Sequence, residues 1–552
     1  MLASWPGTPG VCCSSQPPPA PINAQARSQP RQSSSVSTRA ASPVMSRIMS
    51  SERISSPITL SSPHRDEPGK WPLSFRARRP AGTERLYYNP GWPPHAGGPI
   101  PLQEPRMARK ANTQSALRSS GRRWAVPGPH TIAREVLPNG IVVLAYENFS
   151  SPSVVVSGLL WAGALDDPPD RIGLASFTAE ALTRGTSHRT FHEIYEAIES
   201  VGASLEIGAG YHTTGFTLKA LAEDLPAMLE ILADVLRNPT FPEEGVEKVR
   251  GEILTDLQER EHDTRRMAGL RFRETLFQGH PYGRSVDGYP ETVQAITRED
   301  LLAFHRTFYH PARMIVAVVG AIRAEEAVRA VQVVLGDWEA RRPEPPSLPP
   351  AAPPARWIHV HTPIPGKTQV DLVLGTVGLA RKDPEYYAAA LANSILGVFG
   401  MMGRLGDHVR DRDGLAYYVY SRLDAGLAPG PWSVIAGVAP EHLPRAIQGI
   451  RMEIRRMQER RVPARELEEN KSFLIGSLPL RLETNEGIAG ALVDMELFEL
   501  GLDYLERFPE IIRSITAAEV QAVVRKYLDP DRMVLSTAGP EPAPPMPQEG
   551  AP

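Results

Sequence analysis

The sequence AITREDLLAFHRTFYHPARMIVAVVGAI, residues 295–322, returns near the end of the chain as SITAAEVQAVVRKYLDPDRMVLSTAGPE, residues 514–541. The two stretches align without a gap at a constant offset of 219, which pairs Thr297 with Thr516, Pro311 with Pro530, Arg313-Met314 with Arg532-Met533, and Gly320 with Gly539. A generic helix, turn and strand would reproduce the apolar positions, but not the capping threonine, the proline and the Arg-Met pair together. The repeat therefore predicts two homologous α+β domains of about 200 residues each.

A proline-rich segment separates the two copies. Residues 341–355 read RRPEPPSLPPAAPPA. Proline at this density favours extended polyproline II and forbids a helix or an inner strand, so we expect an interdomain linker. We place the first domain at residues 128–340 and the second at residues 356–541, with a disordered tail at residues 542–552.

Residues 1–127 are rich in serine, proline, arginine and glycine and show little periodicity. They cannot bury enough apolar surface to offset the entropy of ordering, so we expect a disordered N-terminal tail. Its composition resembles an organelle transit segment, but the tail is too long and too often broken by proline to form one amphipathic helix. Translation could also begin at Met45, Met49 or Met107, which leaves open whether residues 1–106 are translated or retained.

The charge and the cysteine content exclude several classes of function. The formal net charge is −3 and the sequence pI is about 6.6, which gives no case for a nucleic-acid surface. The two cysteines, Cys12 and Cys13, are neighbours in the N-terminal tail, so the predicted domains have no thiol for a disulfide, a thiolate zinc site or a nucleophile. No apolar run approaches the roughly 20 residues of a membrane helix, and no signal pattern is evident. We therefore expect a cytoplasmic protein with neither a nucleic-acid nor a membrane partner.

Local patterns in the predicted domains indicate strands alternating with helices. Residues 131–148, TIAREVLPNGIVVLAYEN, predict a hairpin with its turn at LPNG. A helix that ends at Asn238-Pro239 is predicted by leucines at helical spacing, at Leu225, Leu229, Leu232 and Leu236. A strand after the linker is predicted by the alternation of Val370, Leu372 and Leu374 to one face.

Several stretches share one resemblance. They are GLASFTAEALTRGT (residues 173–186), GHPYGRSVDG (279–288), the repeated AITREDLLAFHRTFYHP, and GMMGRLGDHVRDRDGLAYYV (400–419). Together they resemble the pitrilysin/insulinase-type peptidases, the inverzincins with an H-x-x-E-H zinc motif, over residues 131–540. The resemblance implies two domains of the metallohydrolase type found in pitrilysin and the processing peptidases.

The motif itself is missing. In active members it follows Gly-Leu-Ala directly, so the resemblance places its three functional positions on Ser176, Ala179 and Glu180. The chemistry needs two histidines one helical turn apart as zinc ligands, and a glutamate that takes a proton from zinc-bound water. Serine is a poor zinc ligand and alanine cannot accept a proton. The resemblance therefore implies a degenerate zinc site with no catalytic residue, in a chain that is not an active peptidase alone.

The family's remaining zinc ligand is a glutamate on a later helix, in a stretch that resembles RGEILTDLQE, and its position here carries Asp256. A further glutamate position, seven residues earlier, carries Val249. With Ile253 these residues follow i, i+4, i+7 spacing, so the stripe that should face the metal is mostly apolar. Glu180 and Asp256 with one hydroxyl would suit a hard cation better than zinc. We nevertheless expect Glu180 to be a partly solvated helix residue and Asp256 to make a local hydrogen bond.

A second histidine pattern lies just downstream. His188 and His192 in SHRTFHE would stand one turn apart on a helix, as zinc ligands do, but Phe191 holds the position where an inverted motif requires glutamate. We expect two exposed helix histidines here.

An arginine and a tyrosine in the second half match a further feature of these peptidases. In these peptidases the half or subunit opposite the zinc supplies an Arg and a Tyr seven residues apart, which hold the substrate backbone, and the resemblance places them on Arg410 and Tyr417. The segment predicts a helix with Leu405 and Val409 inward, a stop at Gly414, and a strand after it. The alternative is that the arginine complements the helix dipole and the tyrosine follows strand propensity.

The segment ILGVFGMMGRLGDHVR before this pair carries four glycines. In the non-catalytic subunit of mitochondrial processing peptidase, a relative, a glycine-rich loop in the corresponding place is associated with substrate handling. The alternative is that Met401 and Met402 simply pack. The segment lacks the Lys-Ser/Thr of a phosphate-binding loop, so no nucleotide is expected.

Loss of the zinc positions with retention of the Arg/Tyr pair favours a catalytically silent subunit of a heteromeric zinc metalloendopeptidase. This chain would bind no cofactor and would hold unfolded peptide, while a homologous partner with H-x-x-E-H carries the zinc. Two alternatives stay open. One is a structural scaffold subunit, as in the core subunits of a respiratory complex that share this fold, and the other is a peptide-binding module that works without a partner.

Overall fold

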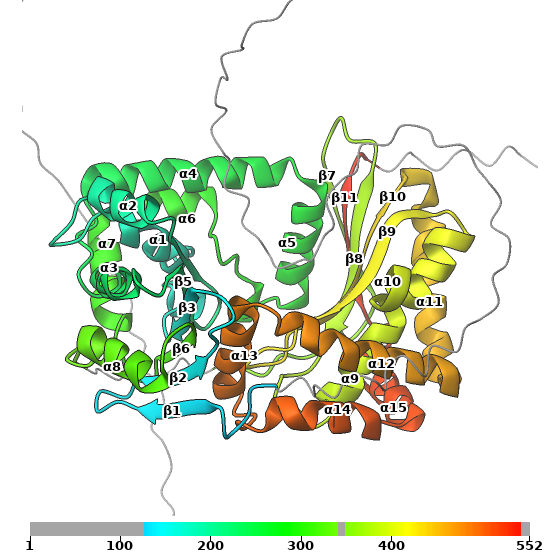
Figure 1. The fold of residues 1–552 in the computed structure, drawn as a ribbon. Coiled ribbons are helices and arrows are strands. Elements are labelled where there is room, and N and C mark those ends of the chain that lie inside the picture. The colour runs from blue at the N-terminus through cyan, green and yellow to red at the C-terminus, as the bar shows by residue number, and fades with distance from the viewer. Residues whose placement is uncertain (1–125, 340–347, 542–552) are drawn as a thin grey trace, which may run out of the picture. The chain divides into compact units, whose positions relative to one another are not determined.

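The repeated stretch forms the same helix, turn and strand twice in the computed structural model (Figure 1). Both helices begin at a threonine, because Thr297 and Thr516 each accept a hydrogen bond from the backbone N–H three residues on. The predicted duplication is therefore confirmed down to the helix caps. The elements are α7 (Arg298–Phe308) and β6 (Ile315–Gly320) in the first copy, and α15 (Ala517–Tyr527) and β11 (Val534–Gly539) in the second.

The structure describes residues 126–339 and 348–541, which belong to one compact unit of the chain. The expected N-terminal tail up to residue 125, the part of the expected linker at residues 341–347, and the expected tail at residues 542–552 lie outside the described residues.

The first half builds a six-stranded sheet in the order β1-β2-β6-β3-β5-β4. β2 and β6 run parallel, and the other neighbours pair antiparallel. The predicted hairpin is confirmed, with Val136 opposite Val142 and a φ of 89° at Gly140 in the turn. The strands are β1 (Ile132–Val136), β2 (Val142–Glu147), β3 (Ser153–Leu160), β4 (Ser204–Ala209) and β5 (Thr214–Leu221).

The second half builds a five-stranded sheet in the order β7-β11-β8-β10-β9. β7 and β11 are its parallel pair, as β2 and β6 are in the first sheet. The predicted alternation in β8 is confirmed, since Leu372 and Leu374 join one buried cluster and Val373 and Val377 join another. The strands are β7 (Ile358–Pro363), β8 (Val370–Val377), β9 (Ala416–Leu423) and β10 (Pro431–Val438).

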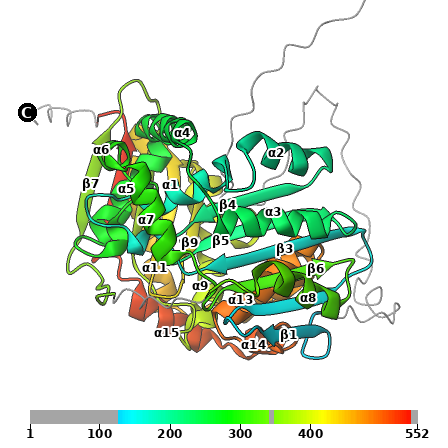
Figure 2. The same cartoon turned by 90° about the vertical axis from the view of Figure 1, so that its left-hand side faces the viewer.

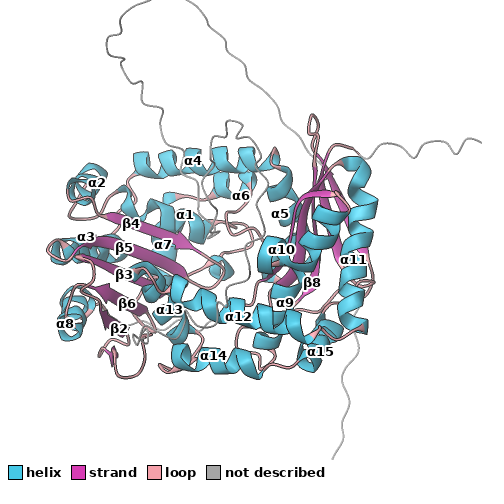
Figure 3. Cartoon of the chain, turned by 45° about the vertical axis from the view of Figure 1, so that its right-hand side comes forward, coloured by secondary structure: helices cyan, strands magenta, loops and turns pink. Residues whose placement is uncertain are grey.

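Helices of the same half cover one face of each sheet (Figure 3). In α3 the four leucines that predicted this helix are all buried. The helices of the first half are α1 (Leu174–Ala181), α2 (Phe191–Ser200), α3 (Leu225–Arg237), α4 (Glu243–Glu261), α6 (Pro290–Ala295) and α8 (Ala324–Leu335). Those of the second half are α9 (Tyr386–Gly397), α11 (Leu443–Glu459), α12 (Ala464–Arg481) and α14 (Tyr504–Ser514).

The other face of each sheet is covered by a helix from the opposite half. α5 (Thr264–Leu276) follows α4 in the first half but packs on β8 and β11 of the second sheet (Figure 1). α13 (Asn485–Leu497), from the second half, packs on β3 and β6 of the first sheet (Figure 2). Phe272 of α5 shares a buried cluster with Val534, and Leu492 of α13 shares one with Val319. The two halves thus complete each other's cores by a reciprocal exchange of helices.

Polar contacts fix the register of this exchange. Asn485, at the start of α13 and 6% exposed, donates to the carbonyl oxygen of Ser153 at 3.1 Å and accepts from Asn148 at 2.7 Å. Arg134 of β1 makes a bidentate ion pair with Glu496 at 2.7 and 2.8 Å. A bidentate pair fixes orientation as well as distance, so these contacts define the position and orientation of α13 on the first sheet.

Over the described part of the chain, no single helix is long and apolar enough to cross a membrane. One bent pair of helical segments, residues 386–397 and 399–412 at 87° to each other, reaches the necessary length and composition when the two are taken together.

Candidate functional site

The helix that resembles a zinc-binding helix is α1, and two backbone segments approach closely at its start. Gly173 has a φ of 99°, and a Cβ there would lie 2.9 Å from the Cα of Gly288, which itself has a φ of 79°. Two of the stretches that carry the resemblance therefore meet at a point where only glycine fits. The carboxylate of Asp167 accepts from the backbone N–H groups of Gly173 at 2.7 Å and Ala175 at 2.8 Å. Burial raises the pKa of Asp167 to about 7, although these N–H groups act in the opposite direction.

The three motif positions lie on α1. Ser176 is 4% exposed and Ala179 is 2% exposed, whereas Glu180 is half-buried. The hydroxyl of Ser176 donates to a carboxylate oxygen of Glu180 at 3.3 Å. This contact joins two of the positions within one turn of the helix, and the third offers only a methyl group.

Asp256, at the remaining ligand position, lies on α4, which packs against α1. Both of its carboxylate oxygens accept from the guanidinium of Arg266 on α5, at 3.1 and 2.7 Å. The residues at the other positions of the expected stripe, Val249 and Ile253, are 0% and 5% exposed and belong to the core. The local hydrogen bond expected of Asp256 is thus a bidentate ion pair, and nothing in the sequence pattern indicated Arg266.

The residues at these positions do not fit a zinc ion. They offer a hydroxyl, a methyl group and two carboxylates, one of which is already bound by a guanidinium, whereas protein zinc sites are built mainly from imidazole and thiolate donors. Within residues 126–339 and 348–541, no three His, Cys, Asp or Glu side chains are grouped so that they could hold a metal ion.

The expectation for His188 is wrong in one respect, since this residue does not lie on a helix. α2 begins at Phe191, because Thr190 is its N-cap and forms a capping box with Glu193. The sequence T-F-H-E contains this signal, and reading it would have placed His188 in the preceding loop. Only His192 of the two histidines is helical, so they do not present a ligand pair on one helix face.

The loop that contains His188 is held by Asp234 of α3, a carboxylate that is 5% exposed. Four side chains approach its oxygens: Thr186 at 2.7 Å, His188 at 2.7 Å, Arg189 at 2.8 Å and Asn238 at 3.0 Å. Burial alone would raise the pKa of Asp234, but the hydrogen bonds from these neighbours outweigh it and hold the pKa below the ordinary value of 3.8. The sequence reading missed this anchor, which has no local signature.

The glycine-rich segment forms α10 (Phe399–Leu405), whose interior backbone is not helical. Gly400 and Gly403 have φ values of 62° and 63°, and a Cβ on Gly403 would lie 2.6 Å from the carbonyl oxygen of Ile395. These glycines therefore permit a tight bend of the chain. Met401 is 62% exposed and Met402 is half-buried, so the alternative in which both simply pack does not hold for Met401.

Arg410 and Tyr417 lie on neighbouring elements, as the segment predicts. Arg410 belongs to a π-helix at Gly406–Arg412, and Tyr417 lies near the start of β9, against which this π-helix packs. Leu405 and Val409 are fully buried and Gly414 has a φ of 62°. The ring of Tyr417 is 85% exposed, and the Nε of Arg410 donates to Asp411 at 2.9 Å. Helices of the π type occur frequently at functional sites.

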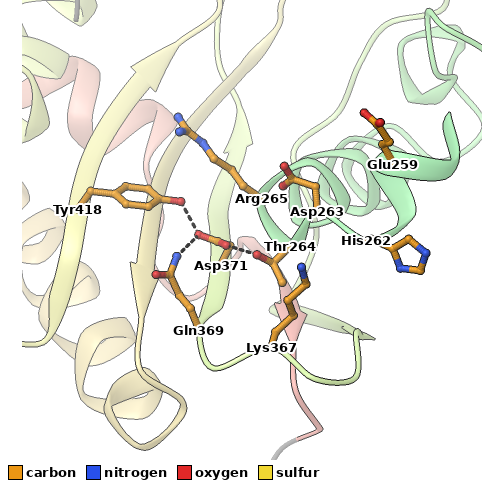
Figure 4. Close-up of a pocket in the computed structure, with 9 residues that line it drawn as sticks. All are labelled: Glu259, His262, Asp263, Thr264, Arg265, Lys367, Gln369, Asp371 and Tyr418. Atoms are coloured by element: carbon orange, nitrogen blue, oxygen red, sulfur yellow. Dashed lines mark hydrogen bonds between the residues drawn. The ribbon is translucent and has the colours of Figure 1, made fainter. Parts of the chain in front are cut away.

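A cavity of about 350 Å³ opens where α5 begins beside the second sheet, and none of the candidate site residues lines it (Figure 4). Its floor is Asp371 of β8, which is 3% exposed and accepts from the hydroxyls of Thr264 and Tyr418 and from the amide of Gln369. Burial and the nearby carboxylate both raise the pKa of Tyr418. Arg265 lies over the rings of Tyr418 and Tyr420. This network joins α5 to the second sheet and was not indicated by the sequence.

Two family models and several curated proteins match this chain. Residues 142–288 match the family model described as Insulinase (Peptidase family M16), and residues 295–474 match that described as Peptidase M16 inactive domain. An uncharacterized zinc protease of Streptomyces coelicolor is 30% identical over 442 residues, which cover 78% of this chain and 95% of the relative. A probable mitochondrial-processing peptidase subunit beta of Arabidopsis thaliana is 33% identical over 196 residues, which cover 36% of this chain and 37% of the relative.

Solved structures also include proteins that share the fold of this chain. The crystal structure of a peptidase M16 inactive domain from Pseudomonas fluorescens superposes with a TM-score of 0.69 at 27% identity, over 74% of this chain and 98% of that one. A chain of complex III₂ from Candida albicans has a TM-score of 0.62 at 15% identity over 74% of this chain and 95% of that one, which shows a common fold. The family models, the Streptomyces relative and the shared two-domain α+β fold together confirm the resemblance: the chain belongs to the M16 peptidase family, that of insulinase and pitrilysin.

Proposed function

We propose that this chain is the catalytically silent subunit of a two-chain zinc endopeptidase. It binds unfolded peptide, while a homologous partner with an H-x-x-E-H motif holds the zinc. A cytoplasmic location is part of this proposal.

The observation that supports the proposal is an asymmetry between the two halves. In the first half, Ser176 and Ala179 are buried and Asp256 is tied to Arg266, so the former metal positions now serve packing and a structural ion pair. In the second half, Tyr417 is 85% exposed beside the π-helix that carries Arg410. Arg410 itself is 22% exposed and pairs with Asp411, so the asymmetry consists of buried or ion-paired residues at the metal positions and an exposed tyrosine beside this arginine.

The Arg/Tyr pair suits peptide without regard to its side chains. A guanidinium and a phenol both donate hydrogen bonds, and every peptide bond offers a carbonyl acceptor. Arg410 and Tyr417 would therefore hold and orient the backbone of an extended substrate, a contribution that lowers the barrier through positioning. Zinc in the partner supplies the activated water, and no step of the reaction requires a base from this chain.

The test uses the full chain with the H-x-x-E-H homologue that co-purifies with it from the native host. Replacing Arg410 with alanine is expected to lower kcat/KM for an unfolded fluorogenic peptide about tenfold or more, because charge-assisted hydrogen bonds are worth about 1.5–3 kcal/mol. Tyr417→Phe is expected to lower it several-fold. The matched control is Arg412→Ala, since Arg412 is an exposed arginine of the same π-helix that pairs with Asp413.

Equal activity in the Arg410→Ala, Arg412→Ala and wild-type complexes would refute the substrate-binding role. Recovery of the tagged chain without an H-x-x-E-H homologue and without chelator-sensitive cleavage would favour the scaffold alternative. Peptide binding by the purified chain in the absence of a partner and of any cleavage activity would favour the lone binding module.

The proposal also predicts that this chain does not bind zinc. A ligand that binds only the folded state stabilises it by RT ln(1 + [L]/Kd), about 2.7 kcal/mol at a hundred times Kd, so a genuine site would raise the melting temperature on zinc addition. We expect no rise at micromolar zinc for the tag-free chain. A saturable rise that the substitution Glu180→Ala abolishes would contradict the proposal and restore a metal site on α1.

A further inference from the structure

Beneath the π-helix that carries Arg410 lies a buried carboxylate, that of Glu453 on α11. Its side chain is 1% exposed. Burying a charged group is costly unless partners replace its hydration in full. The environment of Glu453 therefore indicates whether this residue serves stability or another purpose.

The partners of Glu453 do not satisfy it in full. His408 of the π-helix places its Nδ1 3.0 Å from Oε1, an approach that does not have hydrogen-bond geometry, and Arg456 of α11 donates to the same oxygen. The other oxygen, Oε2, has no hydrogen-bond partner within the described residues. A buried acceptor without a partner costs about 1–3 kcal/mol, so this oxygen needs either a bound water or a compensating role.

The contacts of Glu453 converge on the segment that presents Arg410. His408 precedes Arg410 by two residues in the π-helix, and the charge of Glu453 also acts on Arg404 and Arg412 at either end of the segment. Arg404 is itself held by a bidentate ion pair with Glu466 of α12, at 2.7 and 2.6 Å. The backbone from Gly400 to Gly403 is bent, and the π-helix is also held by buried Val409 and by its packing against β9 and α11.

We infer that Glu453 is a positioning residue for peptide binding, which fixes through His408 the turn of the π-helix that presents Arg410. The inference rests on the proposed function. A buried carboxylate with one oxygen unpaired is costly to keep, and its position under the π-helix favours a role in placing that helix. Glu453 touches no substrate in this arrangement and acts only through the segment above it.

The role has a signature that a purely structural residue lacks. Removing one partner of a buried ion pair is destabilising chiefly where the other charge is left buried, but both His408 and Arg456 reach solvent, at 30% and 38% exposure. Glu453→Gln is therefore expected to leave the melting temperature unchanged or higher while it weakens peptide binding several-fold, up to about tenfold. Stability and binding would move in opposite directions.

The measurement is the Kd of the full chain, in complex with its H-x-x-E-H homologue and with a chelator present to prevent cleavage, for a short fluorescein-labelled peptide rich in alanine and serine. Anisotropy gives the Kd, and melting temperatures are recorded in parallel. The variants are Glu453→Gln, Arg410→Ala and the double substitution, with His408→Asn as a probe of the same contact from the π-helix side. The matched control is Glu469→Gln on α12, an exposed glutamate that pairs with Arg465. We expect the double variant to bind as weakly as Arg410→Ala alone, because Glu453 acts through Arg410.

The outcomes distinguish failure of the positioning role of Glu453 from failure of the proposed function. If Arg410→Ala weakens binding but Glu453→Gln does not, or if their effects add, the positioning role is overturned and the proposed function stands. A fall in stability together with binding, or an unfolded Glu453→Gln protein, shows a structural role and also overturns the inference, as does normal binding by a folded His408→Asn. If Arg410→Ala itself binds peptide normally, the proposed function fails and the inference fails with it.

Discussion

Replacing Asp371 with alanine is expected to lower the free energy of unfolding by about 3 kcal/mol, because the substitution removes the buried acceptor shared by two hydroxyls and an amide. Thr264 and Tyr418 both donate to this carboxylate, and Thr264 is the first residue of α5. The loss should be measured by urea denaturation of the full chain. Hydrogen exchange should also accelerate in α5, since the helix loses its polar anchor on the second sheet.

The control for this substitution is Asp170→Ala. Asp170 is 74% exposed and pairs with Arg171, and an exposed ion pair is worth about 0–1 kcal/mol. If the two variants unfold at the same urea concentration, or if exchange in α5 is unchanged, the network around Asp371 does not hold the exchanged helix in place.

Replacing Asp234 with alanine is expected to cost about 2–3 kcal/mol, because it removes the common acceptor of the loop after α1 and leaves Thr186 buried without its partner. The pKa of Asp234 is held below 3.8 in the folded chain, so the folded state binds fewer protons than the unfolded state. Its contribution is therefore present above pH 3.8 and is lost as the pH falls through the folded-state pKa.

The pH dependence gives this prediction a second check. The difference in unfolding free energy between wild type and Asp234→Asn should be largest near neutral pH and should shrink below pH 3.8. Asp170→Asn serves as the control, since Asp170 is 74% exposed and pairs with Arg171 at the surface. A difference that stays constant across this range would mean that the charge of Asp234 contributes nothing to stability.

The fold could be predicted because its signals are local and occur twice. The capping threonines, the Pro and the Arg-Met pair recur at a constant offset, and each marks a helix start or a turn whose geometry depends on neighbours in the chain. The same local logic predicted a helix and a strand around Arg410 and Tyr417, although not that the helix is of the π type. The prediction for His188 was wrong because it did not take account of the capping signal at Thr190, which places the start of α2 after this histidine.

The contacts that decide the character of the site are not local, and this is why the sequence did not reveal them. The pairing of Asp256 with Arg266 depends on the angle between α4 and α5, and α5 takes its place from a sheet in the other half. Glu453 lies on the same face of α11 as Ile450 and Met457, and the sequence does not show which side chains a buried carboxylate on this face would meet. Whether a charged residue is buried depends on the elements packed around it, which the local sequence does not show.

The exchange of α5 and α13 has a consequence for how the protein is made. During synthesis the apolar face of β3 and β6 emerges early, whereas α13, which covers it, is among the last helices to leave the ribosome. At about 5–20 residues per second the face stays uncovered for tens of seconds. The nascent first half therefore depends on chaperones, or on transient contacts of its own, until the final part of the chain arrives.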